Sequence, residues 1–123
     1  MKINNIYLLS ETKFAKAISN WVLDSHIEIG EFKKHIGQEN DIDGLIIFTE
    51  NQSIDKDCNE LRDIFDKKQK PVQKIDINGT LNVGVSNFTF WLERNNCKSI
   101  LAIGADSLVS NPNFERLLSH LKA

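Results

Sequence analysis

Three short, almost uninterrupted apolar runs restrict the fold of this chain more than any other feature. They occupy residues 6–9, 45–48 and 100–103, and each stops at a small polar turn that leads towards a helical pattern. Strands that are apolar on both faces are typical of a parallel sheet with helices packed on both sides. The pattern therefore predicts an α/β fold, a three-layer sandwich with a mostly parallel five-stranded sheet, Rossmann-like or flavodoxin-like.

The remaining segments alternate between helical and extended patterns, as such a sandwich requires. Segments with apolar residues at helical spacing lie at 14–22, 54–70, 85–92 and 112–121. Short extended patterns near Ile27 and Val72 are interrupted by polar residues. Strands of that kind belong at the edges of a sheet. We therefore expect these two at the edges, and the strands near Leu45 and Ile100 in the interior.

Length and composition exclude several classes of protein. The 123 residues suit one domain that spans residues 1–123. A net charge of −2 with 26% charged residues gives no basic stripe, and no apolar stretch has the length of a membrane span. We therefore expect neither nucleic acid nor a membrane as a partner. Cys58 and Cys97 lack metal-ligand spacing and no apolar leader precedes the first strand, which together predict a cytoplasmic protein.

The polar turns that follow the three apolar runs form the candidate binding site. Ligands of parallel sheets bind in the crevice outside the carboxyl ends of the strands, so the turns after Leu9, Phe48 and Ile103 should meet there. Free N–H groups at the start of a helix, with a lysine beside them, favour an anion. We therefore predict a nucleotide-like or other phosphate-bearing small molecule. The predicted ligand-binding residues are Ser10, Thr12, Lys13, Thr49, Asn51, Gly104, Asp106 and Ser107.

The same residues also fit a purely structural role, because Ser, Thr, Asn and Asp often cap helices at strand-to-helix turns. Residues 78–80, Asn-Gly-Thr, match neither the P-loop nor the dinucleotide-binding glycine spacing. The three histidines are dispersed, without a partner at metal or catalytic spacing. The sequence thus assigns no catalytic residue, no metal and no cofactor. It leaves open whether the chain is an enzyme and whether its copies associate.

Between residues 43 and 112, several short motifs follow one another in a recognisable order. They are Asp43-Gly44-Leu45-Ile46-Ile47-Phe48-Thr49, Lys70-Pro71-Val72, Trp91-Leu92, and Ile100-Leu101-Ala102-Ile103-Gly104 with Ser107 and Pro112. This arrangement resembles the molybdenum-cofactor carrier proteins. The resemblance implies a Rossmann-like fold and a cofactor held through phosphate and pterin contacts near the carboxyl ends of the strands.

The chain departs from that family at two places that concern the ligand. The glycine-rich loop that the family has after its first strand is replaced by Ser10-Glu11-Thr12-Lys13, and the arginine expected near the last turn is absent. Asp106 lies in that neighbourhood instead, and a negative charge disfavours an anionic cofactor. A shortened relative whose ligand has been lost or exchanged would fit this pattern.

A second resemblance, to TIR domains, points to a different class of function. Residues 48–53 followed by Cys58-Asn59-Glu60-Leu61 look like the TIR segment in which a helix glutamate supports cleavage of NAD. In other TIR domains the same surface serves only for self-association. Here the spacing between Cys58 and Glu60 is one residue short, and the preceding aromatic residue is missing. The sequence favours the simpler interpretation of Glu60 as a solvated residue on an amphipathic helix.

Overall fold

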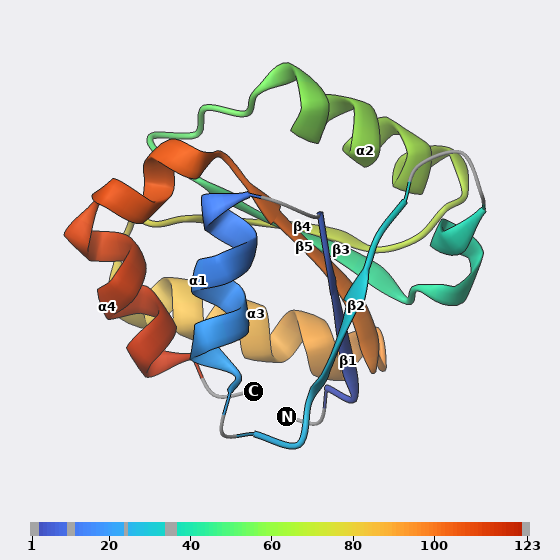
Figure 1. Cartoon of the computed structure of the whole chain (residues 1–123), viewed down its shortest axis with the longest axis horizontal. Coiled ribbons are helices and arrows are strands. Elements are labelled where there is room, and N and C mark those ends of the chain that lie inside the picture. Colours follow the sequence, from blue (N-terminus) through green and yellow to red (C-terminus); the bar gives the residue numbers. More distant parts are fainter. Residues whose placement is uncertain (1–2, 10–11, 24, 34–36, 122–123) are drawn as a thin grey trace.

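The computed structural model describes residues 3–9, 12–23, 25–33 and 37–121 (Figure 1). Within them strands and helices alternate as predicted, except that only a short 3-10 turn was found between the second and third strands. The strands are β1 (Asn5–Leu8), β2 (Glu28–Glu31), β3 (Gly44–Thr49), β4 (Val72–Asp76) and β5 (Ser99–Gly104). The helices are α1 (Lys13–Trp21), α2 (Lys56–Lys67), α3 (Leu81–Arg94) and α4 (Pro112–His120), with the 3-10 turns η1 (Gln38–Asp41) and η2 (Asp106–Ser110). No helix in this part of the chain is long and apolar enough to cross a lipid bilayer.

The strands of the described residues form one sheet in the order β2-β1-β5-β3-β4, and every neighbouring pair is parallel. β3 and β5 are interior strands and β2 and β4 are the edges, which confirms the predicted positions. β5 lies between β1 and β3, with Ile100 opposite Ile6 and Ala102 opposite Ile46. The carboxyl ends of these three strands therefore emerge next to one another.

Helices cover both faces of the sheet, which gives the predicted three layers. α2 packs on one face, whereas α1, α3 and α4 pack on the other (Figure 1). Successive residues of β3 serve the two layers in turn: Ile46 and Phe48 join the core under α1, α3 and α4, and Leu45 and Ile47 join the core under α2. All residues of β3 are buried, which accounts for its continuous apolar sequence.

The start of α2 is set by a local capping contact. Asp55 Oδ1 accepts a hydrogen bond from the Cys58 N–H at 2.8 Å. An N-cap aspartate of this kind satisfies one of the free N–H groups in the first turn of the helix. The helix therefore begins at Lys56, two residues later than the predicted start at residue 54.

The carboxyl end of α2 is a turn that also differs from the prediction, which extended the helix to residue 70. Gln69 has a φ of 57°, and the N–H groups of Gln69 and Lys70 donate to the carbonyl oxygens of Asp66 and Phe65. This arrangement is a Schellman motif, which usually has glycine at the position with positive φ. Asn96, with a φ of 50°, takes the same position after α3.

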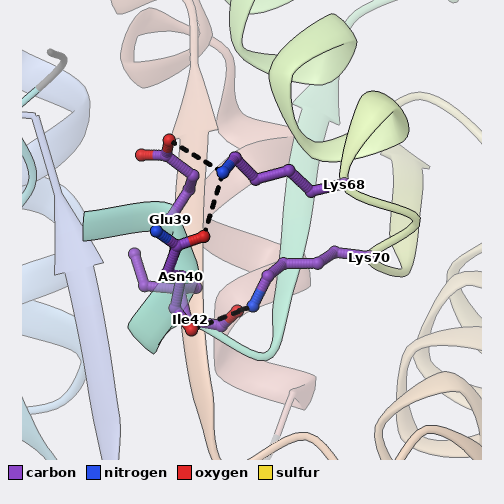
Figure 2. Close-up of polar contacts among 5 residues, drawn as sticks. All are labelled: Glu39, Asn40, Ile42, Lys68 and Lys70. Carbon is purple, nitrogen blue, oxygen red and sulfur yellow. Dashed lines mark hydrogen bonds and ion pairs between the residues drawn. The ribbon is translucent and has the colours of Figure 1, made fainter. Parts of the chain in front are cut away.

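Two lysines beyond the end of α2 hold η1, at the end of the sheet opposite the candidate site. Lys70 Nζ donates to the carbonyl oxygens of Asn40 at 3.2 Å and Ile42 at 2.6 Å (Figure 2). Lys68 Nζ donates to Asn40 Oδ1 at 3.0 Å and lies 3.8 Å from a Glu39 carboxylate oxygen. Both lysines therefore connect α2 to the segment that precedes β3.

Candidate functional site

The chain leaves the adjacent strands β3 and β5 towards opposite faces of the sheet. After β3 it runs to α2, whereas after β5 it runs through η2 to α4. Diverging connections from neighbouring parallel strands open a crevice at the carboxyl ends. Here a cavity of about 240 Å³ lies at that point. Its walls come from the end of β3 and the turn that follows, the start of α2, and Ala105, Ser107 and Leu108 after β5.

The lining of this crevice combines acceptor groups with apolar side chains. Glu50 and Asp55 contribute carboxylates, and Ser53 and Ser107 contribute hydroxyls. The apolar part includes Ile47 from β3, which is buried. Pockets of this composition use a few polar groups to orient a ligand and apolar surface to retain it.

Both carboxylates already have one hydrogen-bond partner within the protein. Glu50 Oε2 accepts from Asn111 Nδ2 at 2.7 Å, and Asp55 Oδ1 accepts from the Cys58 N–H. An ionised carboxylate can accept further hydrogen bonds. Among the described residues that line the crevice there is no lysine or arginine. The crevice therefore attracts cations and hydrogen-bond donors and repels anions.

The turn between β3 and α2 is stabilised from a neighbouring strand. Asn51 and Gln52 have φ values of 55° and 65°, and the Ser53 N–H donates to the Glu50 carbonyl at 3.1 Å. Positive φ at both central residues is typical of a type I′ turn, which glycine adopts more easily than other residues. Asp76, at the end of β4, accepts hydrogen bonds from both central N–H groups, at 3.1 and 2.9 Å. This contact holds Glu50 and Ser53 at the crevice.

Side-chain amides link the carboxyl ends of β3 and β4 to the start of α4. Asn78 Oδ1 accepts from Asn111 Nδ2 at 3.1 Å and from Asn113 Nδ2 at 2.7 Å, and Asn78 Nδ2 donates to Asn51 Oδ1 at 3.1 Å. The connections of β3 and β4 also leave towards opposite faces, so topology alone would allow a second crevice here. The amides bond to one another instead, and the cavity beside them is smaller, about 130 Å³.

Two of the predicted site residues cap α1. Thr12 Oγ1 accepts a hydrogen bond from the Ala15 N–H at 2.9 Å, and Asp106 Oδ1 accepts one from the Phe14 N–H at 3.1 Å. The sequence predicts an anionic ligand at the N-terminus of α1. In the structure the Asp106 carboxylate occupies that position instead. Lys13, the first residue of α1, is exposed.

The other predicted residues take different positions. Thr49 is buried, and its hydroxyl donates to a backbone carbonyl of β4 at 3.4 Å. A Cβ atom on Gly104 would lie 2.7 Å from the Phe14 ring, so this glycine permits close packing under α1. Ser10 lies outside the described residues. Of the predicted residues that the structure describes, Ser107 lines the crevice, whereas Asn51 belongs to the turn beside it.

The two carboxylates of the crevice, Glu50 and Asp55, are not among the predicted ligand-binding residues. A signal for them exists, since both belong to the polar segment between the end of β3 and the start of α2. Which of these side chains line the crevice depends on the type I′ turn. Because that turn contains Asn51 and Gln52 without a glycine, its positive φ values are not evident from the sequence.

A larger groove, of about 510 Å³, runs between α1 and the edge strand β2. Its walls include Lys16 and Ser19 on α1 and Ile29 on β2, which is 45% exposed. The groove also reaches the carboxyl ends of β1 and β2, and Thr12, one of the predicted ligand-binding residues, lies in its wall. We favour the smaller crevice as the candidate site, because it lies between the interior strands β3 and β5 and two carboxylates and two hydroxyls line it.

Comparisons with known proteins agree with this architecture. No family model matches the chain, and no curated protein matches it. Among solved structures it is similar to a crystal structure described as "Putative molybdenum carrier protein" from Syntrophus aciditrophicus SB, with a TM-score of 0.74 over 96% of this chain and 91% of that chain. The two sequences are 12% identical, so the likeness is one of fold. It confirms the predicted Rossmann-like α/β architecture and the resemblance to that group of proteins.

The TIR-like alternative gains no support from these comparisons. Glu60, the residue on which it depends, lies on α2 and is exposed. It is not among the described residues that line the crevice between β3 and β5.

The residues at the carboxyl ends of the strands do not fit the phosphate-bearing cofactor that the resemblance implies. Asp106 occupies the N-terminus of α1, and Glu50 and Asp55 make the crevice acidic. Gly104 faces core side chains, so its missing Cβ leaves no space for a ligand. Among the described residues there is also no group of three or more His, Cys, Asp or Glu that could hold a metal ion.

Proposed function

We propose that this chain is a small-molecule binding domain whose ligand occupies the crevice between the carboxyl ends of β3 and β5. The observation that carries the proposal is the cavity itself. It lies where two adjacent parallel strands send their connections to opposite faces, and Glu50, Ser53, Asp55 and Ser107 converge on it.

The charge and size of the crevice favour a compact ligand that carries hydrogen-bond donors or a positive charge. Glu50 and Asp55 are acceptors when ionised, whereas the hydroxyls of Ser53 and Ser107 can donate or accept. The volume, about 240 Å³, is below the range of roughly 300–1,000 Å³ that is usual for drug-sized ligands. A small amine, amide or polyol fits these properties best.

A nucleotide-like or other phosphate-bearing ligand, as predicted from the sequence, would have to keep its phosphate away from Glu50 and Asp55. Lys13, exposed at the start of α1, would be its counter-charge, and Asp106 at the same helix start would oppose it. Binding of a phosphate-bearing ligand in the crevice would therefore contradict the proposal that the crevice selects cations and hydrogen-bond donors.

The proposal is tested by NMR titration of the labelled chain with small amines, amides, polyols, nucleotides and pterins. Binding should shift the amide signals of Glu50, Ser53 and Ser107. Ser107→Phe, which fills the crevice, should abolish these shifts. Ser119→Phe, the same change at an exposed position on α4, should preserve them. Shifts that are absent throughout the panel, or that survive Ser107→Phe, would count against the crevice as the site.

The variant Glu50→Gln identifies the charge of the ligand. A glutamine oxygen can still accept from Asn111, so the change removes the charge and keeps the shape. A cationic ligand should then bind about tenfold more weakly. Tighter binding of a phosphate compound to this variant would restore the prediction made from the sequence.

A further inference from the structure

Each of the two carboxylates at the crevice has one oxygen engaged by the protein. Glu50 Oε2 accepts a hydrogen bond from Asn111 Nδ2 at 2.7 Å, and Asp55 Oδ1 accepts one from the Cys58 N–H at 2.8 Å. An ionised carboxylate has two acceptor oxygens, so Glu50 Oε1 and Asp55 Oδ2 can accept from a ligand. The crevice thus offers a ligand one oxygen from each of two side chains.

Asn111 determines which oxygen of Glu50 is engaged. Asn111 Oδ1 accepts from the Asn113 N–H at 2.9 Å and caps α4, so the amide nitrogen is left to donate. Its two N–H groups go to Glu50 Oε2 and, at 3.1 Å, to Asn78 Oδ1. Rotation of the amide would break all of these hydrogen bonds. We therefore expect Glu50 Oε2 to remain engaged when a ligand enters.

This arrangement suits an ammonium group better than a planar cation. A primary ammonium has three N–H donors that diverge, so it can bond to oxygens of separate side chains. Glu50 Oε1 and Asp55 Oδ2 supply two acceptors, and a serine hydroxyl at the crevice supplies a third. A guanidinium or amidinium group instead has parallel N–H bonds that match both oxygens of one carboxylate. Here that match requires an oxygen that already accepts from the protein.

The rest of the crevice suits an alkyl group on that ammonium. Ile54 and Leu108 line it from the two layers of the sandwich, and Ala105 lies between β5 and η2 in the same wall as Leu108. Apolar side chains of this kind retain the carbon part of a ligand. A metal ion fits less well, because the part of the chain that the structure describes has no group of three or more His, Cys, Asp or Glu that could hold one.

The N-terminus of α2 also borders the crevice, and its dipole opposes a cation. The dipole places about half a positive charge at that end of the helix. Asp55 is the N-cap of α2, so its carboxylate offsets this charge. Glu50 belongs to the turn after β3 and is half-buried. Its negative charge is therefore available to the ligand.

We propose that the crevice recognises a primary alkylammonium compound, and that Asn111 is the positioning residue that makes the crevice prefer it to guanidinium and amidinium compounds. The inference rests on the proposed function and narrows its ligand class. Asn111 acts through Glu50: it engages one carboxylate oxygen and leaves the other to accept a single N–H group from the ligand.

Three compounds with the same four-carbon skeleton test this preference in an NMR titration of the labelled full chain. They are n-butylammonium, butanamidinium and butan-1-ol, which differ in the polar group alone. The amide signals of Glu50, Ser53 and Ser107 report each dissociation constant. We expect n-butylammonium to bind at least about tenfold more tightly than either of the other two compounds.

The variant Asn111→Ser tests the positioning residue. Serine can still cap α4 but is too short to hold Glu50, so both oxygens of Glu50 become available to butanamidinium. The preference for n-butylammonium should then fall to about threefold or less. Asn113→Ser is the matched control, because its amide donates to Asn78 at 2.7 Å and not to Glu50, and it should keep the native preference. General destabilisation would weaken all three compounds alike and leave their ratios unchanged.

Two results would overturn this inference and leave the proposed function intact. One is butanamidinium or butan-1-ol binding to the native crevice as tightly as n-butylammonium. The other is a preference for n-butylammonium that Asn111→Ser leaves unchanged. If neither these compounds nor any other of the small molecules shifts the crevice signals, the proposed function fails and the inference fails with it.

Discussion

The carboxylate of Asp106 accepts a hydrogen bond from the Phe14 N–H at 3.1 Å and so joins positions 92 residues apart in the sequence. The bond ties the segment after β5 to the start of α1. A negative charge is stabilised at the N-terminus of a helix, where free N–H groups and the helix dipole are positive. A helix start that looks like an anion-binding site from the sequence is therefore neutralised within the protein.

The first prediction concerns this cap. Asp106→Ala removes the carboxylate and leaves the Phe14 N–H without its partner, so the free energy of unfolding should fall by about 1 kcal/mol. Urea titration followed by circular dichroism measures the change. Asp63→Ala, at an exposed position within α2, should change it by less than about 0.5 kcal/mol. Equal effects of the two variants would show that Asp106 contributes no more than a surface charge.

Substitution by alanine should have opposite effects on the stability of the protein at Gly104 and at Gly84. A Cβ on Gly104 would lie 2.7 Å from the Phe14 ring and 2.8 Å from Leu108, so Gly104→Ala should cost about 1–3 kcal/mol through overpacking. On Gly84, inside α3, a Cβ would meet its nearest neighbours at 3.7 and 3.9 Å. Gly84→Ala should therefore raise the free energy of unfolding by up to about 1 kcal/mol, because alanine has a higher helix propensity than glycine. Thermal unfolding of both variants checks the sign of each effect.

The turn after α2 predicts a stabilising substitution. Gln69 has a φ of 57°, a conformation that costs other residues more than glycine. Gln69→Gly should raise the free energy of unfolding by about 1 kcal/mol, while the backbone hydrogen bonds of the motif remain. Lys67→Gly, inside the last turn of the same helix, should lower it by a similar amount. The prediction fails if glycine destabilises the protein at both positions.

The buried Cys97 predicts a loss of stability at alkaline pH. Burial, with a smaller contribution from the Asp43 carboxylate, raises the pKa of this thiol from 9.0 to about 11. The folded state therefore favours the protonated thiol. Its contribution to stability is complete below the pKa of the unfolded chain and is lost as the pH rises through about 11. Between pH 9.0 and about pH 11, the urea concentration at the unfolding midpoint should therefore fall more steeply with pH for the native chain than for Cys97→Ala.

Gly44 and Trp91 enclose the Cys97 thiol, so the burial of this thiol can also be tested by alkylation. A Cβ on Gly44 would lie 2.9 Å from the Trp91 ring and 3.1 Å from Cys97 Sγ, so the thiol is tightly enclosed. In the variant Cys58→Ser, alkylation of the remaining thiol should require unfolding, because a protonated and enclosed thiol reacts slowly. Rapid alkylation of the folded variant at neutral pH would contradict this account.

The sequence by itself determined the architecture, because continuous apolar runs such as that of β3 can be satisfied only between two layers of helices. It also determined the edge positions, since polar interruptions in β2 and β4 are tolerated where one side of a strand meets solvent. Capping residues and prolines in the sequence predicted the ends of the helices to within a few residues. In the structure, Asp55 and Gln69 set the two ends of α2.

Only the tertiary structure decided how the polar turns are used. The position of β5 between β1 and β3 brings Asp106 to the start of α1, a contact between residues too distant in sequence for any local pattern to indicate. Asp76 stabilises the turn at Asn51 and Gln52 from a neighbouring strand, and that turn determines that Glu50 and Ser53 line the crevice. Helix caps and ligand-binding sites use the same amino-acid types. Whether a polar side chain caps a helix or faces the crevice therefore depends on how the strands pair and on which hydrogen-bond partners this pairing brings within reach.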